Sequence, residues 1–172
     1  MSWLLALSYV VHVLAALLWI GAVLYVAYTL VPAGGGAVGA DGLGLALDRL
    51  LAVTRWTGVA LPVTGLYQVW ALYPLDRLLG TTRGHLVVGM FLLWGAMNGL
   101  LELGVYRART VDGTGLSLRT YMAEGVGAEG GLPRNRAGEV LATVRPYLVA
   151  SAALSVLLAV DAALLAGGLA AL

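Results

Sequence analysis

The chain has 172 residues, of which 60% are hydrophobic and only 11% are charged, and its mean hydropathy is +0.90. This composition is typical of a protein that crosses a membrane several times, and it leaves no room for a separate soluble domain. The net charge of +1 indicates nothing about partners, because the arginines are distributed unequally across the membrane, and the sequence carries no nucleic-acid footprint. The absence of cysteine excludes disulfides and thiolate metal sites.

Four apolar stretches are long enough to cross a bilayer, which takes about 20 residues. They are residues 3–31, 56–73, 85–106 and 146–172. The first is too long for a cleavable signal peptide and lacks a basic start. We therefore predict an all-α protein, with residues 1–172 forming one integral membrane domain that is an antiparallel four-helix bundle embedded in the lipid bilayer.

The connections differ in length and character. Pro32 and the glycines that follow it, Gly34–Gly36, predict the end of the first helix. Residues 43–53 gather apolar side chains on one face, which predicts an interfacial amphipathic segment before the second span; these side chains are Leu43, Leu47, Leu50 and Leu51. The connection 74–84 is short, whereas residues 107–138 form a long, glycine-rich loop.

The positive residues are all arginine, and their placement predicts the orientation of the bundle. Only Arg77 and Arg83 lie in the second connection, while the other arginines flank the first and third. The positive-inside rule then places the first and third connections in the cytoplasm. Both termini of this multi-pass protein of the cell membrane are predicted to lie outside.

His12 lies in the outer half of the first span, where a titratable side chain is costly and marks a candidate functional site. At helical spacing it shares a face with Ala15, Ala16 and Trp19. His85 heads a similar face on the third helix, with Gly89 one turn below. Small residues of this kind let another helix approach closely or leave room for a flat ligand. His85 can also be an interfacial histidine that forms a hydrogen bond near the helix start.

Two acidic residues lie within the spans. Asp161 reaches about the depth of His12, and it can pair with that histidine, bond a hydroxyl on a neighbouring helix, or meet water near the outer mouth. Glu102 lies near the cytoplasmic surface and is predicted to form a structural ion pair with one of three arginines at that level, Arg55, Arg107 or Arg145.

Several of these residues together resemble a known family. The resemblance rests on His12, Trp19 and Gly21 in HVLAALLWIGAV, the pair Thr64 and Gly65, the segment GHLVVGMFLLWGAMNGLLE with Asn98, and Arg145 at the start of the last span. In these residues the chain resembles the membrane domain of the copper-resistance D (CopD) family. The resemblance covers nearly the whole chain. It implies a four-helix unit for copper uptake or homeostasis, with the family histidine at His12.

A more distant resemblance is to the HemJ-type protoporphyrinogen oxidases, which bind haem through a first-helix histidine and carry a lysine on the third helix. This chain departs from that pattern, because Gly89 or its neighbour occupies the lysine position and the chain has no lysine.

Three functions follow as hypotheses. A copper ion would be held by His12 with Met90, Met97 or His85, and Gln68, Asn98 and Glu102 would form a polar path toward the cytoplasm. Met90 and Met97 can equally be core-filling residues. Haem b would take His12, and possibly His85, as axial ligands. In both cases Asp161, Trp19 and Asn98 are predicted to surround the site.

The third hypothesis is a non-catalytic accessory subunit of a membrane complex. No catalytic residue is predicted under any of the three. The expected partners are a redox or copper-carrier protein, or further copies of the chain.

Overall fold

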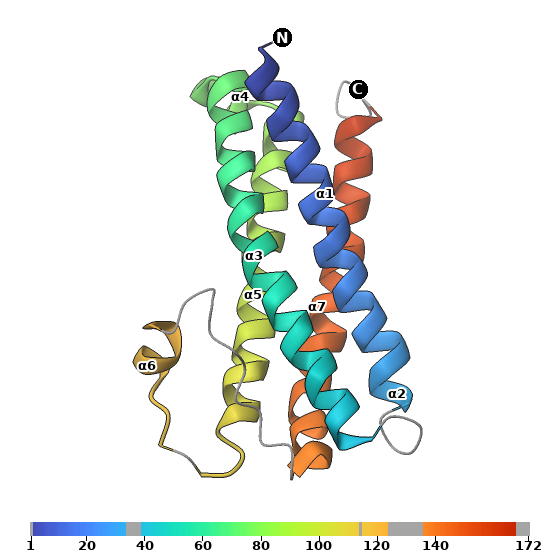
Figure 1. Ribbon diagram of the computed structural model, residues 1–172. Helices are drawn as coiled ribbons and strands as arrows, with labels where there is room; N and C mark the ends of the chain where they lie inside the picture. The colour runs from blue at the N-terminus through green and yellow to red at the C-terminus, as the bar shows by residue number, and fades with distance from the viewer. Residues whose placement is uncertain (1, 34–38, 114, 124–135, 168–172) are drawn as a thin grey trace.

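The computed structural model describes residues 2–33, 39–113, 115–123 and 136–167, and within these ranges the only regular secondary structure is helical. The predicted all-α class is therefore confirmed. Four long helices lie side by side and run in alternating directions (Figure 1); they are α1 (Trp3–Tyr25), α3 (Ala40–Leu72), α5 (Thr82–Arg109) and α7 (Ala137–Ala166).

The two ends of the bundle carry different connections. The start of α1, the end of α7 and the short helix α4 (Leu75–Gly80) share one end, which we call the outer end (Figure 1). Helix α6 (Leu118–Ala123) lies toward the opposite, inner end. There α1 continues through a π-helical turn, Val26–Leu30, into α2 (Val31–Ala33).

Three helical segments in the described part of the chain are long and apolar enough to cross a membrane, namely Trp3–Leu30, Thr82–Arg109 and Gly138–Ala166. Helix α3 is not among them, although it is the longest of the described helices; charged and polar residues such as Asp48, Arg55 and Gln68 interrupt its apolar sequence. Many large apolar side chains on the bundle are exposed, as suits contact with lipid.

Some helix boundaries differ from the sequence-based prediction. Residues 43–53 are the first part of the continuous helix α3 and not a separate segment, because the leucines on their apolar face are buried against the other helices. Helix α7 begins at Ala137, and Pro146 lies inside it. Helix α5 extends beyond 85–106 at both ends. Gly34–Gly36 and the end of the predicted fourth span lie outside the described residues.

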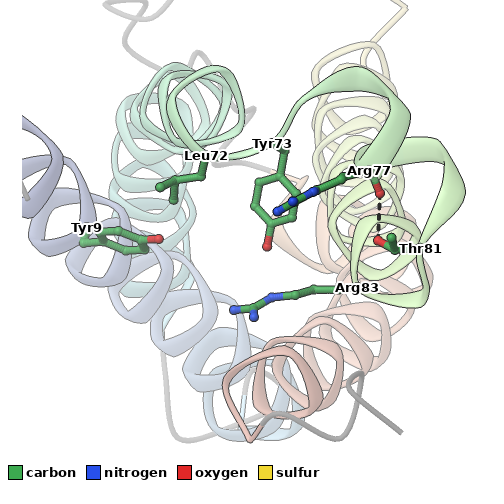
Figure 2. Close-up of a pocket in the computed structure, with 6 residues that line it drawn as sticks. All are labelled: Tyr9, Leu72, Tyr73, Arg77, Thr81 and Arg83. Atoms are coloured by element: carbon green, nitrogen blue, oxygen red, sulfur yellow. Dashed lines mark hydrogen bonds between the residues drawn. The ribbon is translucent and has the colours of Figure 1, made fainter.

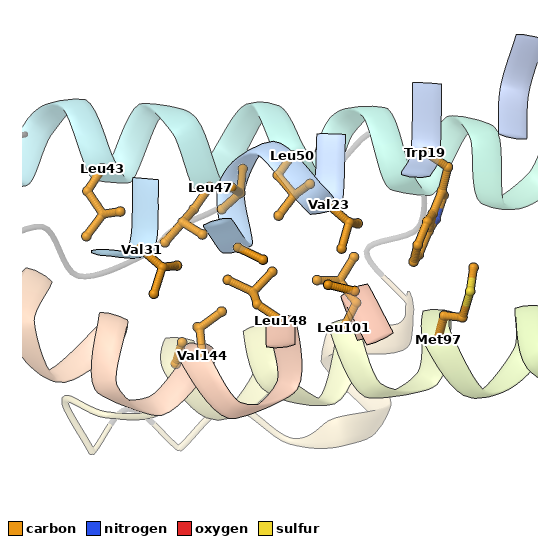
Figure 3. Packing of buried hydrophobic residues seen from close by; sticks show 14 of the residues in the cluster. Trp19, Val23, Val31, Leu43, Leu47, Leu50, Met97, Leu101, Val144 and Leu148 are labelled. Carbon is orange, nitrogen blue, oxygen red and sulfur yellow. The ribbon is translucent and has the colours of Figure 1, made fainter. Parts of the chain in front are cut away.

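The hydrophobic core is densest in the inner half. Side chains from α1, α3, α5 and α7 meet there (Figure 3), and the buried set includes Trp19, Val23, Leu47, Met97, Leu101, Val144 and Leu148. Nearer the outer end few side chains are buried, and several of these are polar, such as Ser8 and Asp161. The inner half therefore holds the helices together, whereas the outer half is less densely packed.

The helices associate mainly as two pairs, α1 with α3 and α5 with α7. Small residues bring the second pair together: a Cβ added at Gly104 would lie 2.7 Å from the Cβ of Tyr147. Ser151 also donates a hydrogen bond of 2.8 Å to the carbonyl oxygen of Met97. Close backbone approach with cross-helix hydrogen bonds is a common means of holding helices together in a membrane.

Candidate functional site

His12 is half-buried between α1 and α3, and its ring is held in one tautomer. Its Nδ1 lies 2.8 Å from Oγ1 of Thr64. That hydroxyl lies 2.7 Å from the carbonyl oxygen of Ala60, which takes its single proton. Nδ1 must then donate to Thr64, so Nε2 carries the lone pair of the neutral ring. A histidine ordered in this way resembles metal-ligating histidines, whose second nitrogen donates to a protein oxygen.

Gly65 provides the space for this ring. A Cβ at Gly65 would lie 3.2 Å from Cε1 of His12, which is tighter than ordinary van der Waals contact. The two neighbouring residues therefore have complementary effects on His12: Thr64 orients the imidazole, and Gly65 lets it lie close to α3.

A short chain of polar side chains continues from His12 toward the outer end. Gln68 donates a hydrogen bond of 3.0 Å to Oγ of Ser8, and Ser8 donates one of 3.3 Å to the carbonyl oxygen of Thr64. These bonds tie α1 to α3 one turn above His12. Ser8 was not among the site residues predicted from the sequence. Its position four residues before His12, on the same face of the helix, is the feature from which it could have been predicted.

Trp19 and Asn98 form a separate link below the histidine. Nε1 of Trp19 donates to Oδ1 of Asn98 at 3.2 Å, and Nδ2 of Asn98 donates to the carbonyl oxygen of Trp94 at 3.1 Å. Oδ1 also lies 3.0 Å from where a Cβ of Gly58 would stand. This contact connects α1, α3 and α5 about two turns from His12 along α1.

The other predicted ligands, His85, Met90 and Met97, all lie on α5. His85 is exposed, and its Nε2 lies 2.8 Å from the carbonyl oxygen of Leu79 near α4. Met97 is fully buried in the core of the inner half, and Met90 packs against the edge of that core. Within the described residues, no three His, Cys, Asp or Glu side chains cluster as a metal site.

Asp161 is buried in the outer half of α7, with an exposed fraction of 9%. It faces α5, where its Oδ2 lies 3.4 Å from the position of a Cβ on Gly89. The side chain that bonds to Nδ1 of His12 is Thr64 on α3.

A cavity of about 520 Å³ opens at the outer end (Figure 2). Its lining comes from α1, the end of α3, α4 and the start of α5, and consists of Tyr9, Leu72, Tyr73, Arg77, Thr81 and Arg83. The guanidinium of Arg83 and the hydroxyls of both tyrosines point toward its centre (Figure 2). From the sequence, Arg77 and Arg83 bear only on the orientation, because the positive-inside rule counts charges and not their directions.

A charged cluster occupies the inner end. Arg55 forms a two-point ion pair with Glu102, with Nε–Oε1 at 3.0 Å and Nη2–Oε2 at 3.1 Å. Of the three arginines proposed from sequence, the structure places Arg55 against Glu102. Arg145 is exposed, and Arg107 lies by Tyr147. Glu102, which was predicted to form a structural ion pair, therefore lies with Arg55 at the inner end of the bundle and not beside His12.

Tyr121 of α6 completes this inner cluster. Its hydroxyl donates to Glu102 and accepts from Arg55 at 3.1 Å, while its ring packs edge-on against Tyr106. Burial of the phenol, and then its hydrogen bond to Glu102, raise the pKa of Tyr121 above its usual range. Nothing in the sequence pattern points to Tyr121, because it lies within the predicted loop 107–138, far along the chain from Arg55.

No protein-family model matches the chain, and no curated protein or solved structure matches it.

Proposed function

We propose that the chain is a multi-pass protein of the cell membrane that binds haem b through Nε2 of His12 and takes part in electron transfer. The observation that carries this proposal is the pair of short contacts made by Oγ1 of Thr64, with Nδ1 of His12 and with the carbonyl oxygen of Ala60. From these contacts we infer that Nδ1 donates and that Nε2 keeps the lone pair. When bound, the haem iron would supply one-electron exchange, with its potential set by the axial ligand and the surrounding polarity.

The number of protein donors favours haem over a copper ion. A copper site draws its imidazole and thioether ligands from the protein, so several must converge. Haem brings four nitrogens of its own and needs only one or two axial ligands. His12 has Thr64 and Gly65 as its close neighbours, whereas Met97 lies in the inner core. Copper handling is the second candidate, and the CopD-like spacing of His12, Trp19 and Gly21 favours it.

Helix α3 is proposed as a fourth span, although its composition is more polar than that of the other three. It packs along α1, and its polar side chains Thr64 and Gln68 bond within the bundle, to His12 and Ser8. A polar residue that is satisfied by a neighbouring helix is tolerated at membrane depth. Four spans in alternating directions also agree with the outer ends of α1 and α7 lying together (Figure 1).

The haem assignment is tested on the protein purified in detergent from cells supplied with haem precursor. We expect a Soret band, about one haem per chain by pyridine haemochromogen, and substoichiometric copper by elemental analysis. Stoichiometric copper without a Soret band would replace the haem proposal by copper handling. If the purified protein contains neither haem nor copper, the accessory-subunit hypothesis remains.

The orientation is tested by reporter fusions. A reporter fused after Leu172 is expected to be active only outside the cell, and one inserted at Ser117 only in the cytoplasm, because the arginine-rich connections stay inside. A fusion after Arg77, in the second connection, serves as the matched outer control. A cytoplasmic signal at Leu172 would show an odd number of spans or the reverse orientation, and the outer placement of His12 would then be wrong.

A further inference from the structure

The outer cavity brings together two cations from different elements. Arg77 comes from α4 and Arg83 from the start of α5, and the hydroxyls of Tyr9 and Tyr73 point into the same space (Figure 2). None of the described residues that line it is acidic. Two guanidinium groups and two phenol donors around one opening make a site suited to carboxylates, which arginine binds with two parallel hydrogen bonds.

The junction that carries both arginines is held in a defined conformation. Oγ1 of Thr81 donates to the carbonyl oxygen of Arg77 at 2.7 Å and accepts from the backbone nitrogen of Gly84 at 3.0 Å, which caps α5. A Cβ at Gly84 would overlap the carbonyl oxygens of Arg77 and Leu78, so glycine is required there. The backbones that present Arg77 and Arg83 are thus fixed relative to each other, which lowers the entropic cost of binding one ligand with both.

The cavity also stands close above the candidate haem ligand. Tyr9, which lines it, precedes His12 by three residues on α1, an axial rise of roughly 4.5 Å. A flat molecule attached at His12 and extending toward the outer end would therefore bring its far edge to the cavity. Between the two levels Gln68 and Ser8 tie α3 to α1, so the molecule would pass beside this link.

We propose that Arg77 and Arg83 bind the two carboxylates of the amphipathic macrocycle whose metal is held by His12, that is, the propionates of haem b. This inference rests on the proposed function. In this proposal the cavity is the polar end of the same site, and Tyr9 and Tyr73 are additional hydrogen-bond donors. The macrocycle then lies with its propionates toward the outer face.

The test separates the carboxylate contacts from the iron–histidine bond. Metal-free protoporphyrin IX and its dimethyl ester are titrated into the purified, haem-depleted full-length protein, since neither contains iron and the ester lacks both charges. We expect the free acid to bind at least about 10-fold more tightly than the ester. In the double variant R77Q/R83Q that preference should vanish, whereas R77K/R83K should keep part of it.

The control is R49Q/R119Q, which removes two exposed arginines outside the outer cavity and should leave the preference unchanged. Three outcomes would each overturn the inference: the wild type binds acid and ester equally, it binds neither, or the preference for the acid survives in R77Q/R83Q. Haemin titration of His12→Ala is read separately. If haemin coordination persists in that variant, the proposed function fails, whatever the porphyrin acid shows.

Discussion

Replacing His12 by alanine is expected to abolish the Soret band while leaving a folded, membrane-inserted protein. The substitution removes the proposed ligand nitrogen and the hydrogen bond to Thr64. The Thr64 hydroxyl keeps its bond to Ala60, so no buried donor is left without a partner. The effect on haem content should be nearly complete, and it is measured by pyridine haemochromogen per mole of chain, with size-exclusion chromatography to show intact folding.

His85→Ala is the matched control, because it removes the only other imidazole of the chain. Its Nε2 is engaged by the carbonyl oxygen of Leu79, so we expect haem content to stay unchanged. Loss of haem in both variants would instead indicate two axial histidines, as one of the sequence hypotheses allowed. Unchanged haem in His12→Ala would remove His12 from the site altogether.

Glu102→Gln is expected to give the largest loss of stability among single substitutions of charged residues. The side chain of Arg55 is only 9% exposed and that of Glu102 30% exposed, so the variant leaves a largely buried guanidinium without its counter-charge. Breaking a buried pair costs about 3–5 kcal/mol, and partial exposure of Glu102 reduces this to roughly 2–3 kcal/mol. The thermal midpoint in detergent should fall by about 5 °C or more, with haem content unchanged.

Glu139→Gln provides the comparison for this variant. Glu139 also pairs with an arginine, Arg136, but both side chains are well exposed, at 44% and 62% for Arg136 and Glu139. Such surface pairs contribute little, so its midpoint should stay close to that of the wild type. Equal midpoints for the two variants would show that the inner cluster has no special role in stability. If Glu102→Gln loses haem and Glu139→Gln does not, Glu102 belongs to the functional site.

The class and the long helices could be predicted from sequence because they depend on hydropathy, which each segment carries by itself. The boundaries of α3 could not. A stripe of leucines such as Leu43, Leu47 and Leu50 has the same spacing whether it lies on a lipid surface or against another helix. Only the packing of α1 and α7 on α3 distinguishes the two, and that packing depends on residues far along the chain.

The candidate site shows the same division. His12 could be identified because a histidine in an apolar run is unusual on its own. Its orientation could not, since the hydroxyl of Thr64 reaches it only through the pairing of α1 with α3. Met97 matched the ligand types that copper prefers, yet its place in the inner core follows from helix packing that the sequence pattern does not encode.

The contact between Gly104 and Tyr147 has a consequence for how this sequence can change over evolutionary time. Most lipid-facing positions of the bundle accept any apolar residue of similar size, so they drift freely and retain little trace of ancestry. Position 104 cannot accept even alanine without moving α7 away from α5, because the added Cβ would meet Tyr147 at 2.7 Å. A glycine facing an aromatic residue across these two helices should therefore persist in distant relatives after the surrounding leucines, valines and alanines have been exchanged.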